Sequence, residues 1–196
     1  KPAGPTSHQV SAYVKQILNS IKAGHSGTLD PKVTGVLPIA LDKSTRVLQS
    51  LLTAGKEYVC LMHIHDIVSE EIIREVMKEF VGKIKQLPPV KSAVKRVERR
   101  RKVYGIEILE IKDQDVLFVI DCQAGTYIRK YCHDFGEQIK VGAHMTELRR
   151  TKVGAFKENS LVTLQELKDA FHYYKTNNDD KLLKKCIQPI ENAIQH

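Results

Sequence analysis

The order in which helical and strand-like patterns follow one another most constrains the fold of this 196-residue chain. Apolar residues at helical spacing alternate irregularly with short runs of β-forming residues, such as 56–65. Two of these runs, 103–111 and 116–122, flank the polar segment 112–115, which predicts an antiparallel hairpin. Such an irregular order favours an α+β fold over a doubly wound parallel sheet.

Capping side chains mark three expected helix starts: Thr6 with Gln9, Ser69, and Thr163 with Glu166. The first of these helices carries apolar residues as far as Ile21, and the second is expected to stop at Gly82. Pro38 argues against a central strand in the apolar run 36–41. The other expected elements are a loop over 24–35, a helix over 44–52, a helix within 125–139, a strand-like segment over 143–156 and a short final helix after 176–180.

Positive charge is concentrated in one part of the chain. The net charge is +8 and the pI about 9.3, while residues 91–102 hold seven Lys and Arg side chains and one acid. A basic protein often binds a polyanion, so the segment is either a solvated face or an RNA-contacting loop. No stretch is apolar enough to span a membrane, and four scattered cysteines without a CxxC pair favour buried thiols in a cytoplasmic protein.

Residues 24–35 (GHSGTLDPKVTG) form the segment that carries candidate chemistry. Asp30 lies between glycines, and the following proline favours an extended backbone there, so the loop can hold a carboxylate at a cleft. A plain turn with Asp30 bonded to backbone amides is the alternative. The pattern of a phosphate-binding P-loop is absent. His63 and His65 would share one strand face, but the sequence offers no third ligand nearby, so no metal site is expected.

Five segments in order resemble the motifs of the TruB/dyskerin family of pseudouridine synthases, and especially its archaeal RNA-guided branch. They are 1–8, 24–35, 55–59, 125–129 and 148–151. The resemblance covers essentially the whole chain. It implies the pseudouridine synthase fold, with a mixed, mainly antiparallel sheet flanked by helices and a basic thumb-like loop at 83–102. It implies no cofactor.

The resemblance also implies a reaction, the isomerisation of uridine to pseudouridine in rRNA or tRNA. The glycosidic bond from N1 to the ribose breaks, the base turns and C5 takes its place. Asp30 would be the essential carboxylate, Arg129 would pair with it and hold it ionised, and Tyr58 would stack on the target base and assist proton transfer.

Other residues are implied to bind or support. His25 would contact the displaced nucleotide, Leu148 would pack against the base, and Lys1 and Pro2 would brace the catalytic loop. The position of the basic segment in the thumb-like loop favours RNA contact, and not a solvated face, as its role, because its cations can neutralise phosphates. The candidate RNA-binding cations are Lys95, Arg96, Arg99, Arg100 and Arg101.

The resemblance sets the expected domains and partners. Residues 1–186 would be the catalytic domain, and 187–196 the lead-in to an RNA-binding PUA domain that is not in this chain. A box H/ACA guide RNA would select the uridine in substrate RNA, and small accessory proteins would complete the particle. Two alternatives stay open: a stand-alone tRNA enzyme, and a catalytically silent RNA-binding scaffold of a ribonucleoprotein.

Overall fold

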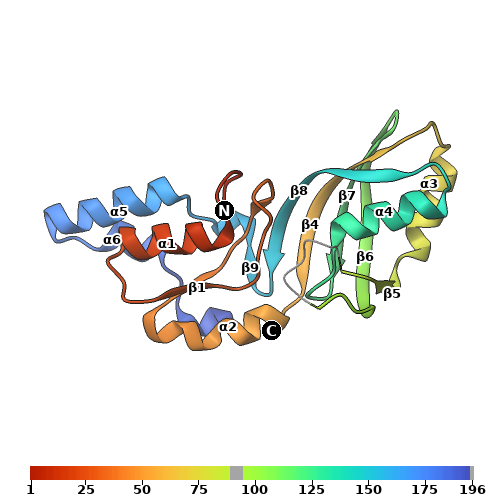
Figure 1. The fold of residues 1–196 in the computed structure, drawn as a ribbon. Coiled ribbons are helices and arrows are strands. Elements are labelled where there is room, and N and C mark those ends of the chain that lie inside the picture. The colour runs from red at the N-terminus through yellow and green to blue at the C-terminus, as the bar shows by residue number, and fades with distance from the viewer. Residues whose placement is uncertain (89–94, 195–196) are drawn as a thin grey trace. The chain divides into compact units, whose positions relative to one another are not determined.

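The computed structural model describes residues 1–88 and 95–194, which form two compact units. The first unit combines Lys1–Ala54 with the part of the chain from Thr151 onward, and the second is the continuous stretch Gly55–Arg150. The second unit is therefore an insertion into the first. Figure 1 labels most of the helices and strands of both. None of the helices in the described part of the chain is long and apolar enough to cross a membrane.

The first unit opens with helix α1 (Ser7–Ile17), whose start confirms the expected capping box of Thr6 and Gln9. The expected extension to Ile21 is wrong, because Asn19 takes a left-handed backbone with φ of 52° and ends the helical path. Ile21 is accordingly 89% exposed. Helix α5 (Leu164–Asn177) begins with the expected capping box at Thr163 and packs beside α1 (Figure 1).

Short elements fill the rest of the first unit. Strands β1 (Ala23–His25) and β3 (Ile39–Leu41) pair antiparallel, so part of the expected loop 24–35 is a strand, as is β2 (Thr34–Gly35). Strand β3 starts directly after Pro38, which lacks the N–H that a ladder needs. The single helix expected at 44–52 is two helices. The remaining elements are η1 (Asp42–Val47), α2 (Leu48–Thr53), β9 (Phe156–Lys157), η2 (Glu158–Ser160), α6 (Lys181–Cys186) and η3 (Ile190–Ala193).

The second unit is built on a sheet with the strand order β8-β4-β7-β6-β5. Strand β4 pairs antiparallel with β7, β7 with β6, and β6 with β5, which confirms the expected hairpin and the α+β class. The helix after Ser69 ends at Glu79, a little before the stop expected at Gly82. Gly82 has a φ of 107° and is the first residue of β5. The elements are β4 (Lys56–Ile64), α3 (Glu70–Glu79), β5 (Gly82–Gln86), β6 (Arg99–Lys112), β7 (Asp115–Cys122), α4 (Ile128–Gln138) and β8 (Ala143–Val153), whose last residues enter the first unit.

Helix α4 covers one face of this sheet (Figure 1). Strand β4 alternates strictly between buried and half-buried residues, as expected for a strand with one face on a core. Phe118 lies against Tyr131 with ring centroids 5.6 Å apart, and the thiols of Cys60 and Cys132 are 3.7 Å apart. Both thiols are buried and all four cysteines are free, in line with the expected absence of a disulfide framework.

Candidate active site

The loop that carries Asp30 is tied to the N-terminal segment of the first unit. Lys1 donates from Nζ to the carbonyl oxygens of Pro31 and Val33, at 2.9 Å each. Its backbone nitrogen donates to Gly35 O at 2.8 Å, and Gly35 N donates back to Lys1 O at 3.1 Å. Asp30 itself is exposed. The loop therefore holds a carboxylate at the surface on a backbone fixed from outside the loop.

Two further contacts hold the same loop. The buried hydroxyl of Ser7 accepts a hydrogen bond from Leu29 N at 2.9 Å and donates one to Leu29 O at 3.1 Å. The first residue of α1 therefore binds the backbone of the residue before Asp30. Burial lowers the pKa of the Lys1 side chain, and the negative charge of Asp30 offsets part of that effect. The ring of His25 lies on β1, with its centroid 5.0 Å from that of His8 in an edge-to-face arrangement.

Tyr58 lies in the second unit, on the core-facing side of β4. Its side chain forms a hydrogen bond with the guanidinium of Arg150, which is only 1% exposed. Burial raises the pKa of the Tyr58 phenol, and the positive charge of Arg150 opposes that rise. Lys56 is on the same strand face and is also buried. The pKa of the Lys56 side chain is lowered to about 8, mainly by its burial and to a smaller extent by the positive charge of Arg150.

Arg129 is exposed in the first turn of α4, and the start of this helix is held by a buried glutamine. Gln86 is 2% exposed and bonds the backbone of Tyr127 twice. Tyr127 N donates to Gln86 Oε1 at 2.9 Å, and Gln86 Nε2 donates to Tyr127 O at 3.1 Å. Because Asp30 belongs to the first unit and Arg129 to the second, the ion pair expected between them stays a prediction.

Part of the expected thumb-like loop is regular strand. Residues Gly82–Gln86 of β5 pair with Arg99–Val103 of β6, so the basic residues 99–101 lie on a ladder while Lys95 and Arg96 precede it. The guanidinium of Arg101 also lies against Gly125, where an added Cβ would come within 3.1 Å of its Nε. Lys91, part of the basic segment noted above, lies outside the described residues. RNA contact by these cations stays a prediction.

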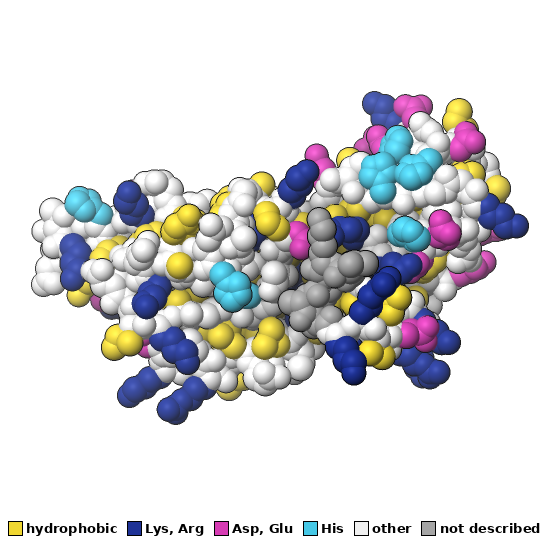
Figure 2. Space-filling model, viewed as in Figure 1, with side chains coloured by type: hydrophobic (Ala, Val, Ile, Leu, Met, Phe, Trp, Pro, Cys, Tyr) yellow, Lys and Arg dark blue, Asp and Glu magenta, His cyan; other side chains and the backbone are white. Residues whose placement is uncertain are grey.

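Three histidines gather at the surface of the second unit, and Figure 2 shows a group of His side chains on the visible face. His65 Nε2 and His144 Nδ1 are 2.8 Å apart, and His63 Nδ1 is 2.7 Å from Asp115 Oδ1. No sequence pattern pointed to His144, because it lies far along the chain from His63 and His65. Within 1–88 and 95–194, no group of three or more His, Cys, Asp or Glu residues is arranged to hold a metal ion.

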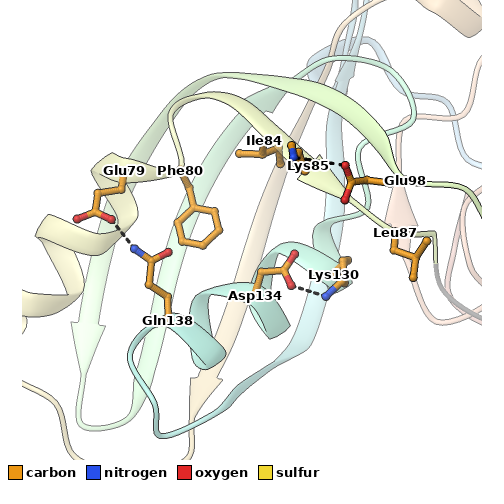
Figure 3. Close-up of a pocket in the computed structure, with 9 residues that line it drawn as sticks. All are labelled: Glu79, Phe80, Ile84, Lys85, Leu87, Glu98, Lys130, Asp134 and Gln138. Atoms are coloured by element: carbon orange, nitrogen blue, oxygen red, sulfur yellow. Dashed lines mark hydrogen bonds and ion pairs between the residues drawn. The ribbon is translucent and has the colours of Figure 1, made fainter.

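An open pocket of about 440 Å³ lies elsewhere in the second unit, between α3, β5 and α4 (Figure 3). Lys130 pairs with Asp134 on its wall, and Lys85 lies 3.6 Å from Glu98. Its lining contains none of Asp30, Tyr58 and Arg129. The remaining lining residues are Glu79, Phe80, Ile84, Leu87 and Gln138.

Comparison with known proteins decides the family. Residues 15–128 match the TruB family pseudouridylate synthase (N terminal domain), and 129–195 match the tRNA pseudouridylate synthase B C-terminal domain. The chain belongs to the TruB family of pseudouridine synthases. The mainly antiparallel α+β fold is the one that the sequence motifs imply.

Archaeal relatives are similar along the entire chain. It is 60% identical to the "Probable tRNA pseudouridine synthase B" of Methanothermobacter thermautotrophicus, covering 100% of this chain and 60% of that protein. The protein of the same name from Methanopyrus kandleri is 57% identical, with 58% of its length covered. The chain thus spans about three fifths of the curated relatives that it matches.

Solved structures agree with the sequence matches. A crystal structure of a Cbf5-Nop10-Gar1 complex matches 100% of this chain and 60% of the chain in that structure, with a TM-score of 0.97 and 58% identity. The structure of an H/ACA RNP bound to a substrate RNA containing 2′-deoxyuridine matches 100% of this chain and 59% of that one, with a TM-score of 0.91 and 54% identity.

Sequence patterns missed three side chains that the structure places beside candidate residues: Lys56, Gln86 and Arg150. Arg150 carried a weak signal. Adjacent residues of a strand point to opposite faces, so one of Arg149 and Arg150 had to face the sheet interior. Gln86 carried none, because its two bonds reach a segment forty-one residues away.

Proposed function

We propose that the protein to which this chain belongs isomerises uridine to pseudouridine in RNA, with Asp30 as the catalytic carboxylate and Tyr58 and Arg129 at the same site. Membership of the TruB family carries the proposal. The structure supports it by the way Lys1 and Ser7 hold the Asp30 loop while the carboxylate stays exposed. A loop anchored outside itself can present a charged group without reorganisation during the reaction.

We further propose residue roles around the reaction. The Asp30 carboxylate would attack or deprotonate the nucleoside and stabilise developing positive charge. Arg129 would orient it, and His25 and Leu148 would contact the displaced uridine. The cations Lys95, Arg96, Arg99, Arg100 and Arg101 would bind phosphates, which makes binding salt-dependent. Residues 1–186 would be the catalytic domain of a cytoplasmic protein, followed by the lead-in to a PUA domain.

Two candidate substrates follow from different matches. The similar structures contain an H/ACA RNP with substrate RNA and the proteins Nop10 and Gar1, which favours a guide-dependent enzyme acting on rRNA with such partners. The names of the curated relatives favour tRNA. Modification of bare tRNA without guide RNA would select the second candidate. A silent scaffold is the remaining alternative.

The test compares wild type with Asp30→Asn in the full-length protein, supplied with guide RNA, target RNA and partner proteins. Release of tritium from uridine labelled at C5 measures the reaction. We expect release from wild type only, with equal RNA binding by both. Equal release from both would overturn the role of Asp30. No release from a complete wild-type particle would favour the scaffold.

A further inference from the structure

Strands β4 and β8 lie side by side in the sheet of the second unit. His65 N donates to Gly142 O at 3.0 Å, and Thr146 Oγ1 donates to Leu61 O at 2.9 Å. As residue numbers fall along β4 they rise along β8, so the two strands are antiparallel. The side chain of Arg150, near the end of β8 within the second unit, forms a hydrogen bond with that of Tyr58.

On the β7 side of β4, the ladder partner of Tyr58 is Ile120. Ile120 is 0% exposed, Arg150 1% and Tyr58 9%. Water therefore has little access to the phenol, and the guanidinium is the charged group that contacts it. An Arg side chain keeps its proton at any pH that the protein meets, so its charge next to the phenol is permanent.

We propose that Arg150 is a positioning residue for the reaction, which holds the Tyr58 hydroxyl in place and stabilises negative charge on its oxygen. This rests on the proposed function, which places Tyr58 at the catalytic site, and on the role in proton transfer that the family resemblance implies for it. Nothing in the sequence motifs or in the matches assigns a role to Arg150. Its burial is otherwise unfavourable, because a charged side chain loses hydration that only a specific partner restores.

A Tyr58 phenolate, the ionised form of the side chain, would accept the proton that the reaction removes from C5 of uracil. After the ribose carbon bonds to C5 of uracil, C5 still carries its hydrogen. When the C5–H bond breaks, its electron pair re-forms the double bond from C5 to C6, the π pair between N1 and C6 moves onto N1, and the proton goes to the Tyr58 oxygen. N1 then takes a proton from water, and the phenol gives its proton up to water after the product has left. Burial disfavours the charged phenolate, and Arg150 offsets part of that cost.

The test measures the ionisation of residue 58 directly. A fluorinated tyrosine, which ionises at lower pH than tyrosine, is placed at position 58 of the full-length protein and titrated by fluorine NMR. We expect Arg150→Met to raise its midpoint by about 1 pH unit or more, and Arg150→Lys by less, because an adjacent opposite charge shifts a pKa by roughly 1–3 units. Arg149→Lys on the opposite strand face is the matched control and should leave the midpoint unchanged.

A second measurement links this effect to the reaction. The single-turnover rate of tritium release is followed against pH at saturating RNA, for wild type and for Arg150→Lys, which retains the charge and is expected to fold. We expect the rise of the rate with pH to move upward by the same amount as the fluorine midpoint, with RNA affinity unchanged. An unmoved fluorine midpoint, or a rate profile that does not follow it, overturns the proposal. A shifted midpoint with no release by wild type instead overturns the proposed function and leaves the pairing of Arg150 with Tyr58 supported.

Discussion

Replacing Gln86 by Met should weaken the second unit by an amount that its two bonds to Tyr127 predict. Met has a similar length but can neither donate nor accept as the amide does. The change removes hydrogen bonds of 2.9 and 3.1 Å in a place where the side chain is 2% exposed. Each such bond contributes about 1 kcal/mol net, and a buried donor that loses its acceptor costs about 1–3 kcal/mol. Losing the bond to Tyr127 O costs about 1 kcal/mol, and leaving Tyr127 N without its acceptor costs about 1–3 kcal/mol. The sum is about 2–4 kcal/mol of unfolding free energy.

Calorimetry and amide exchange check this value. Each kcal/mol shifts the Tm of a chain of this size by roughly 2–4 °C, so Gln86→Met should lower it by about 4–16 °C. The Tyr127 amide should also exchange faster, because it loses its acceptor. Gln165→Met is the matched control, since Gln165 bonds Asp169 at 2.7 Å on an exposed helix face and should matter little. A Gln86→Met protein within about 0.5 kcal/mol of wild type would refute the reasoning.

Further predictions concern packing, pH and salt. Gly136→Ala should destabilise by at least about 2 kcal/mol in urea unfolding, because its Cβ would lie 2.0 Å from Ala143 N, whereas Gly105→Ala, which meets nothing within 4 Å, should not; equal effects would contradict this. Burial lowers the pKa of Lys56 from 10.5 to about 8, so between these values the unfolded chain binds more protons than the folded one. Wild type should therefore gain stability relative to Lys56→Met as pH rises across that window, and a constant difference would count against it. Changing the three arginines at 99–101 to Gln should weaken RNA binding and lower the slope of log K against log salt by about 2–3, whereas an unchanged slope would exclude phosphate contact.

Local signals in the sequence predicted the elements that local contacts determine. The capping boxes at Thr6 and Thr163 close within three residues, so they could be read directly. The end of the first helix was missed, because Asn19 gives little warning that it will adopt a left-handed backbone. Strand β1 was missed because its partner β3 lies beyond a loop, and a three-residue strand has almost no periodicity of its own.

The candidate site likewise contains residues that sequence motifs indicated and residues that they did not. Motifs pointed to Asp30 and Tyr58, and the contacts of Lys1 with the Asp30 loop agree with the bracing role that the resemblance implies. The buried partners could not be found, because whether Arg150 faces the core depends on which strand lies beside β8. A run of charged residues also does not indicate the backbone conformation, and residues 99–101 belong to a strand.

The insertion of Gly55–Arg150 between the two parts of the first unit affects how the chain folds during synthesis. All strands that pair with β4 and β6 have left the ribosome soon after residue 150, so the inserted unit can fold while translation continues. The first unit must wait, because α1 packs on α5, which is made about 150 residues later. The polypeptide that bears Asp30 is thus made before the inserted unit but gains its full set of neighbours only after it.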